Sequence, residues 1–87
     1  MKTIWKEKLE IVDVQHVLIP FESEILTVQI QNGEPYIWFM CDEKRLKNRK
    51  EICIYGTGHP VSDNIGRYIG TFQLYDLGLV FHVFEGD

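Results

Sequence analysis

The feature that most constrains the fold is a series of short runs in which polar and apolar residues alternate, each closed by Gly, Pro, Asn or Asp. This spacing matches the two-residue period of a half-buried β-strand, whereas the 3.6-residue period of an amphipathic helix is hard to find. In residues 3–12, one face carries Trp5, Leu9 and Ile11 and the other carries Lys6, Lys8 and Glu10. In residues 24–31, the expected inward face carries Leu26, Val28 and Ile30. The chain is therefore expected to be built from β-strands.

Seven short β-rich segments separated by turn residues run along the chain, so we predict an all-β fold of about seven antiparallel strands in a small sandwich or barrel. The predicted strands cover residues 3–12, 15–19, 24–31, 36–41, 51–55, 67–75 and 79–84. Asn32-Gly33 is the strongest hairpin signal, because both residues tolerate the positive φ of a primed turn. The charged segment 42–50 is predicted to be a solvated loop or one short helical turn. With 87 residues and no linker or repeat, the chain is expected to form one domain over residues 1–87.

Three of the predicted strands, at residues 36–41, 51–55 and 79–84, are apolar or nearly so on both faces. A domain of this size buries only roughly 60–65% of its unfolded surface, so its single interior is thin. The second apolar face of these strands needs a cover, which is either another element or another chain. We therefore expect a homo-oligomer that associates around Trp38 and Phe81.

Charge and hydropathy argue against several classes of partner. Nine basic and thirteen acidic residues give a net charge of −4, which argues against general nucleic-acid binding. The two Trp, four Tyr and five Phe residues lie mainly in the apolar strands, so core packing explains them better than base stacking. No apolar run has the ~18 residues of a membrane span, and the start of the chain lacks the apolar stretch of a signal peptide. We expect a cytoplasmic protein without membrane contact.

The side chains that could bind a metal are His16, His59, His82, Cys41 and Cys53. No pair among them has the spacing of known zinc ligands, so we predict no metal and no cofactor. We expect His82 to be a strand residue with a hydrogen-bonded imidazole and the other two histidines to lie in loops. The two cysteines would face each other if their strands paired, but in the cytoplasm we expect reduced, buried thiols.

The loop after the fifth predicted strand is the most suggestive local feature. Gly56, Thr57, Gly58 and His59 precede Pro60, and successive glycines expose backbone N–H groups that can hold an anion. Arg67 would supply the positive charge, since no other basic side chain follows Lys50. These five residues, from Gly56 to His59 together with Arg67, form the predicted ligand site. The alternative interpretation is a sharp turn between strands, because the loop matches no known phosphate-binding fingerprint.

A family resemblance covers almost the whole chain. The sequence opens with MKTIWK, carries ILTVQIQNG at 25–33 and IYGTGHP at 54–60, and closes with YIGTFQL at 68–74 and VFHVF at 80–84. With these segments it resembles a family of short uncharacterised proteins of tailed phages and bacteria. The resemblance implies a phage or prophage accessory protein that acts in the bacterial cytoplasm. It implies no activity.

The function expected from these observations is binding rather than catalysis. No nucleophile elbow, carboxylate pair or Cys/His motif is present in the sequence, so we predict a non-enzymatic, homo-oligomeric binding module. Its ligand would be a host protein or a small anionic molecule of the nucleotide type, in a role such as counter-defence. The alternatives are a virion or assembly component and a small hydrolase that uses His59 or His82.

Overall fold

Alternating residues form strands along nearly the whole chain, and the computed structural model describes residues 1–86. The elements are β1 (Thr3–Lys8), β2 (Val14–Pro20), β3 (Glu24–Gln31), β4 (Glu34–Cys41), β5 (Lys47–Gly56), β6 (Tyr68–Leu74), the 3-10 turn η1 (Tyr75–Leu77) and β7 (Leu79–Glu85). Every paired strand is antiparallel to its neighbour. The prediction of an all-β fold with seven strands is confirmed.

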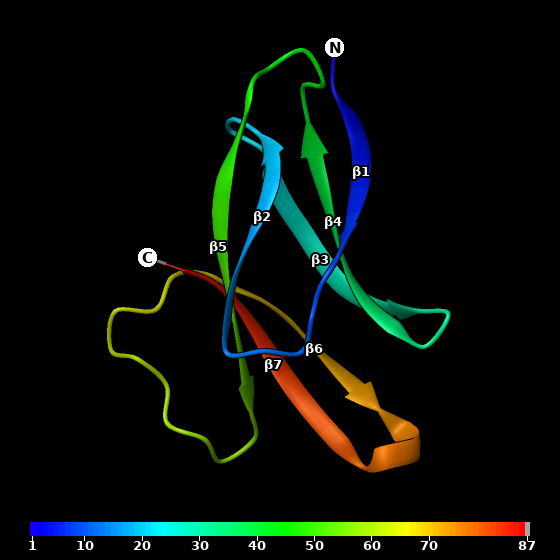
Figure 1. Ribbon diagram of the computed structural model, residues 1–87, viewed down its shortest axis with the longest axis vertical. Helices are drawn as coiled ribbons and strands as arrows, with labels where there is room; N and C mark the ends of the chain where they lie inside the picture. Colours follow the sequence, from blue (N-terminus) through cyan, green and yellow to red (C-terminus); the bar gives the residue numbers. More distant parts are fainter. Residues whose placement is uncertain (87) are drawn as a thin grey trace.

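The strands divide into two sheets (Figure 1). Sheet A has the order β1-β4-β3, and sheet B has the order β2-β5-β7-β6. Two connections are hairpins within a sheet. Asn32 and Gly33 join β3 to β4 with φ angles of 53° and 81°, which is the predicted primed turn, and η1 joins β6 to β7 with Gly78 at φ 67°. The chain crosses between sheets after β1, β2 and β4.

The core lies between the two sheets, because buried side chains of both form one cluster. Sheet A contributes Ile25, Val28, Ile37, Phe39 and Cys41, and sheet B contributes Val17, Ile19, Ile52, Ile54, Ile69, Phe72 and Val83. Leu9, directly after β1, is buried with them, and Trp5 packs against the cluster from β1. The arrangement is a two-sheet sandwich.

A β-bulge in β3 changes which side chains face the core. The register between β3 and β4 shifts between Ile25 and Thr27, so one extra residue interrupts the alternation. As a result Ile25 is buried, whereas Leu26 is 39% exposed. The prediction that Leu26 points inward was therefore wrong, while Val28 is buried and Ile30 packs against the core as expected.

Other features also differ from the prediction. Of the two alternatives predicted for residues 42–50, the loop is correct up to residue 46, where the Arg45 N–H donates to the Asp42 carbonyl at 3.0 Å, but β5 already begins at Lys47. The 3-10 turn lies at Tyr75–Leu77 instead. Strand β1 ends at Lys8, which leaves Ile11 exposed, and His16 lies in strand β2 rather than in a loop. The end of β1, the start of β5 and the place of His16 in a strand follow from pairing with neighbouring strands rather than from the local pattern.

None of the strands predicted to be apolar on both faces buries both of those faces completely. On β4, Ile37 and Phe39 are buried, while Tyr36, Trp38 and Met40 alternate with them and are half-exposed on the outer face of sheet A. Phe81 on β7 packs against the core, with its ring 5.5 Å from that of Phe72. Phe81 therefore belongs to the interior, and only Trp38 of the two predicted association residues lies on an outer face.

The two cysteines lie in different sheets, Cys41 on β4 and Cys53 on β5, so they do not face each other across a strand pair. Both are free and buried, as predicted. Burial, followed by the nearby carboxylates, raises the pKa of both thiols. A thiol that stays protonated is a poor nucleophile, so these side chains act as small apolar residues.

Candidate functional site

The Gly56–Pro60 loop is a tight turn that closes the end of β5. The His59 N–H donates to the Gly56 carbonyl at 3.1 Å, and Gly58 has a φ of +88°, which favours glycine. The His59 ring lies directly over Gly56, where a Cβ would come within 2.9 Å of the imidazole carbon Cε1. The close approach of the His59 ring thus accounts for the glycine at position 56, and the positive φ accounts for the glycine at position 58.

The Thr57 side chain joins this loop to the outer face of sheet B. Its hydroxyl lies 2.8 Å from Nε2 of His82, whose Nδ1 lies 3.0 Å from the Thr71 hydroxyl, which in turn lies 2.5 Å from the hydroxyl of Tyr68. His82 is thus a hydrogen-bonded strand residue, as predicted. The pairing of Thr71 with His82 across β6 and β7 creates this array, and the sequence carried no signal for it.

Arg67 does not lie beside the loop. Gly56 is opposite Phe81 on β7, whereas the Arg67 carbonyl accepts the N–H of Glu85, four residues further along the same strand. Four residues of strand span roughly 13 Å. The structure brings Gly56, Thr57, Gly58 and His59 together and places Arg67 elsewhere.

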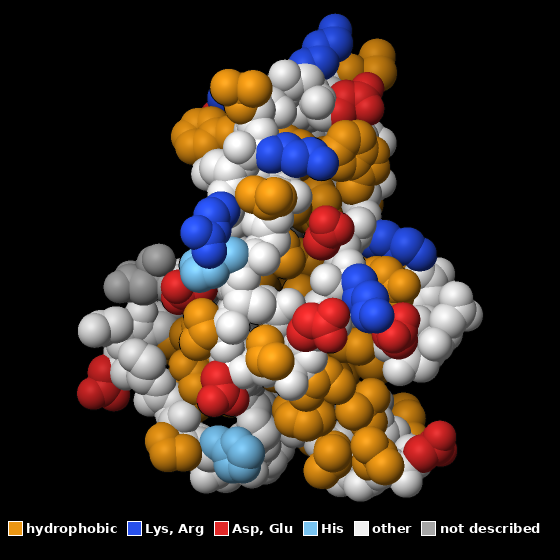
Figure 2. Space-filling model, in the orientation of Figure 1, with side chains coloured by type: hydrophobic (Ala, Val, Ile, Leu, Met, Phe, Trp, Pro, Cys, Tyr) orange, Lys and Arg blue, Asp and Glu red, His pale blue; other side chains and the backbone are white. Residues whose placement is uncertain are grey.

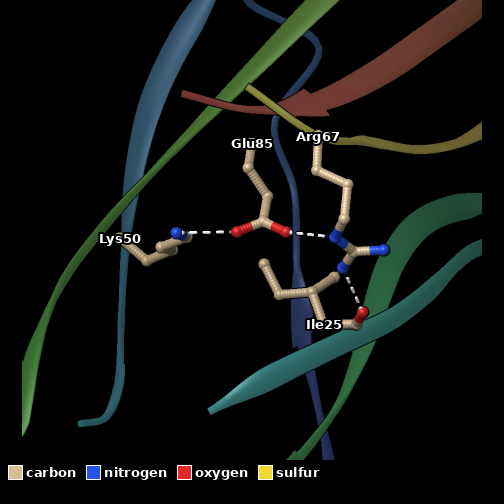
Figure 3. Close-up of polar contacts among 4 residues, drawn as sticks. All are labelled: Ile25, Lys50, Arg67 and Glu85. Carbon is tan, nitrogen blue, oxygen red and sulfur yellow. Dashed lines mark hydrogen bonds and ion pairs between the residues drawn. The ribbon is translucent and has the colours of Figure 1, made fainter. Parts of the chain in front are cut away.

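The Arg67 side chain ties the two sheets together (Figure 3). Its Nε donates to Glu85 at 2.8 Å and its terminal nitrogen donates to the Ile25 carbonyl at 2.6 Å, so it reaches from sheet B to the bulge of β3. Lys50 of β5 donates to the other Glu85 oxygen at 2.7 Å. Burial raises the pKa of Glu85, but the hydrogen bonds and charges of Lys50 and Arg67 outweigh it and hold that pKa below its ordinary value.

A pocket of about 500 Å³ lies at the end of the sandwich, next to η1. It is lined by Lys8, Leu9, Glu10, Ile11, Ile30, Gly33, Glu34, Pro35, Gln73, Leu74, Tyr75, Asp76 and Leu77. Tyr75 and Leu77 are largely exposed on η1, and Figure 2 shows hydrophobic side chains gathered over this turn, at the lower right. No local sequence pattern marks this site, because three segments far apart in the chain form it.

The pocket has an apolar floor of buried or half-buried side chains, namely Leu9, Ile30, Pro35 and Leu74, and a rim that includes exposed acidic side chains. Among its lining residues, Glu10, Glu34 and Asp76 give three negative charges and Lys8 gives one positive charge, a net −2. Lys8 is paired with Glu34 at 2.9 Å, and the hydrogen bond to that carboxylate raises the pKa of Lys8. Within residues 1–86 the Glu10 and Asp76 carboxylates form no ion pair. The pocket is thus suited to an apolar group that is attached to a positive charge.

Across residues 1–86, no three His, Cys, Asp or Glu side chains gather where they could hold a metal ion. None of the helical segments there is long and apolar enough to cross a membrane.

The fold and the pocket define a small all-β protein with an apolar, acid-rimmed site at one end of its sandwich. The chain belongs to the family described as domain of unknown function DUF7352, which it matches over residues 1–87. No curated protein and no solved structure matches it. The expected membership of an uncharacterised family is confirmed, whereas phage origin stays a prediction.

Proposed function

We propose that this protein is a non-enzymatic binding module of a phage or prophage, which acts in the bacterial cytoplasm by capturing a protein segment. The observation that carries the proposal is the pocket beside η1, with its apolar floor and its net negative rim. Exposed apolar side chains around a concave site are typical of protein-binding surfaces. The resemblance to phage and bacterial proteins supplies the cellular context.

The chemistry of the pocket describes the segment that it would bind. Ile11, Ile30 and Leu77 would contact an aliphatic or aromatic anchor, and the Glu10 and Asp76 carboxylates would pair with Lys or Arg beside that anchor. The protein would then discriminate against acidic segments, because like charges at the rim repel them. A host protein with such an exposed segment fits this site.

A small anionic ligand at the Gly56–Pro60 loop is less well supported. The guanidinium that such a ligand needs is engaged by Glu85 and by the Ile25 carbonyl, and the Thr57 hydroxyl is engaged by His82. Calorimetry with nucleotides and cyclic nucleotides separates the two ligand classes. We expect no heat of binding, and a nucleotide bound by the wild type but not by Thr57→Val would return the function to this loop.

Peptide binding tests the proposed function directly. Fluorescence anisotropy would compare labelled peptides that carry leucine between two lysines with matched peptides that carry leucine between two glutamates. We expect only the basic peptides to bind. The Leu77→Lys substitution should lower their affinity at least tenfold, which corresponds to a loss of about 1.4 kcal/mol of binding free energy. The matched control is Leu18→Lys, an exposed leucine on β2 outside the pocket. Equal binding of both peptide classes, or of neither, would contradict the proposal.

A further inference from the structure

The loop between β4 and β5 presents an apolar side chain among positive charges. Leu46 is 87% exposed at the tip of this loop, with Lys44 and Arg45 before it and Lys47 after it. Residues 42–50 carry five basic and two acidic side chains, a net charge of 5 − 2 = +3. In the described chain, neither Lys44 nor Lys47 forms an ion pair. The tip therefore offers an apolar side chain flanked by positive charges, which complements the apolar lining and net negative charge of the pocket.

The backbone of the tip is held in place although its leucine is exposed. The Asp42 side chain accepts the N–H of Lys44 at 3.1 Å, and its carbonyl accepts that of Arg45 at 3.0 Å. The Leu46 carbonyl accepts the Phe21 N–H at 2.8 Å, and Arg45 pairs with Glu22 at 2.8 Å. A preformed loop loses little conformational freedom on binding, which favours its use as an anchor.

The tip and the pocket lie at opposite ends of the molecule. Figure 1 shows the β4–β5 loop at the top and η1 at the bottom of the long axis, which spans 40 Å between Cα atoms. Figure 2 shows Lys and Arg side chains over the upper and middle parts of the same face and none at its lower end. One chain therefore cannot place Leu46 in its own pocket, but a second copy can.

We propose that the pocket binds the β4–β5 loop of a second copy of this chain, with Leu46 in the pocket and Lys47 beside Asp76. This inference rests on the proposed binding role of the pocket and names its partner. The contact joins two different surfaces, so each bound pair keeps one free tip and one free pocket. Association then continues head to tail into a ring or an open filament, with a repeat close to the 40 Å long dimension of the folded molecule.

The test uses two variants that each remove one half of the contact. Leu46→Glu disables the tip and Leu77→Lys disables the pocket, and both side chains are exposed enough for the fold to tolerate the change, which circular dichroism checks. Sedimentation velocity up to about 1 mM covers weak protein association. We expect the wild type to assemble with rising concentration and each variant alone to associate at least tenfold more weakly.

Mixing the two variants gives the decisive result. The intact pocket of Leu46→Glu and the intact tip of Leu77→Lys can form one contact, so the mixture should give a 1:1 dimer and nothing larger. Leu18→Glu, an exposed leucine outside both surfaces, should assemble like the wild type. A monomeric wild type over the whole range overturns the inference, as does a mixture without a dimer or a variant that associates alone as strongly as the wild type.

Charge reversal and a peptide separate this inference from the proposed function. Lys47→Glu should weaken assembly, and adding Asp76→Lys to the partner copy should restore it. The peptide of residues 42–50 should bind the wild-type pocket more tightly than a peptide of the same composition in scrambled order. If basic peptides bind but the wild type stays monomeric, the second copy is not the partner and the proposed function stands. If no peptide binds and no assembly forms, both are wrong.

Discussion

Two polar clusters on sheet B differ in what surrounds them, although their central residues lie three positions apart on β7. Glu85 follows the inward alternation of Phe81 and Val83, and its side chain is only 17% exposed between Lys50 and Arg67. His82 lies on the opposite, outer face, where its hydrogen bonds to Thr57 and Thr71 are exposed to water. A shielded ion cluster that reaches the other sheet should stabilise the fold, whereas a solvated cluster can exchange its hydrogen bonds for water.

Removing the partly buried Glu85 carboxylate should have the largest effect on the free energy of unfolding. Glu85→Ala leaves Lys50 and Arg67 without their shared partner and loosens the tie to the Ile25 carbonyl. Breaking a fully buried pair costs about 3–5 kcal/mol, and the partial exposure of both basic side chains lowers our expectation to about 2 kcal/mol. Urea unfolding measures this loss. Glu24→Ala, an exposed carboxylate on β3, is the control, and an equal effect of both variants would refute the stabilising role of the cluster.

Acidification should remove the same stabilisation gradually. Because the pKa of Glu85 is lowered in the folded state, its contribution is present above the ordinary value of 4.5 and is lost as the pH falls through the lower folded value. Glutamine at position 85 has no carboxylate to protonate, so the Glu85→Gln variant lacks this pH-dependent stabilisation. The difference in unfolding free energy between wild type and Glu85→Gln should therefore narrow as the pH falls below 4.5. Urea titrations at a series of pH values measure this, and a constant difference would contradict it.

A substitution at Gly58, in the exposed turn after β5, should have an intermediate effect on the free energy of unfolding, and this effect should come from backbone strain alone. Nothing lies within 4 Å of a Cβ built on Gly58, but its φ of +88° strains a β-branched residue. We expect Gly58→Val to lower the free energy of unfolding by roughly 1–2 kcal/mol. Gly58→Asn should lose less, since asparagine tolerates positive φ better. If valine and asparagine were equally harmful, backbone strain would not be the cause.

The smallest effect on the free energy of unfolding is expected at the exposed cluster of Thr57, Thr71 and His82. Thr57→Val keeps the side-chain shape and removes the hydrogen bond to His82. Because that bond is exposed, we expect a loss of about 0.5 kcal/mol. A double-mutant cycle with Thr71→Val would measure the coupling through the imidazole. A loss as large as that of Glu85→Ala would show that exposure does not separate the two clusters.

Local sequence predicted the features that depend on neighbouring residues. Two-residue alternation in some segments and short apolar β-rich runs in others predicted the seven strands. Asn32-Gly33 predicted the β3–β4 turn because two adjacent positive φ angles require such residues. The sequence also predicted the reduced, buried cysteines and the hydrogen-bonded imidazole of His82. Of the predicted ligand site, the four residues from Gly56 to His59 do lie together, and they could be grouped because they are consecutive.

Features that depend on register were not predictable. The bulge in β3 reverses the faces of Ile25 and Leu26, and only the pairing with β4 shows it. Arg67 was placed with the glycine loop because no other basic side chain follows Lys50, yet strand pairing sets it beside Glu85. The pocket was missed for the same reason, since its lining comes from residues 8–11, 30–35 and 73–77.

The sequence alone therefore determined which segments are strands, where most of the turns lie and that the core is apolar, because a strand's period and a turn's φ angles are local properties. Tertiary structure decided which strands share a sheet, which face of β3 is buried and what Arg67 binds. It also brought the acidic rim and the apolar floor of the pocket together at one end and left Leu46 exposed at the other. These outcomes depend on contacts between residues far apart in the chain, which the alternation of polar and apolar residues does not encode.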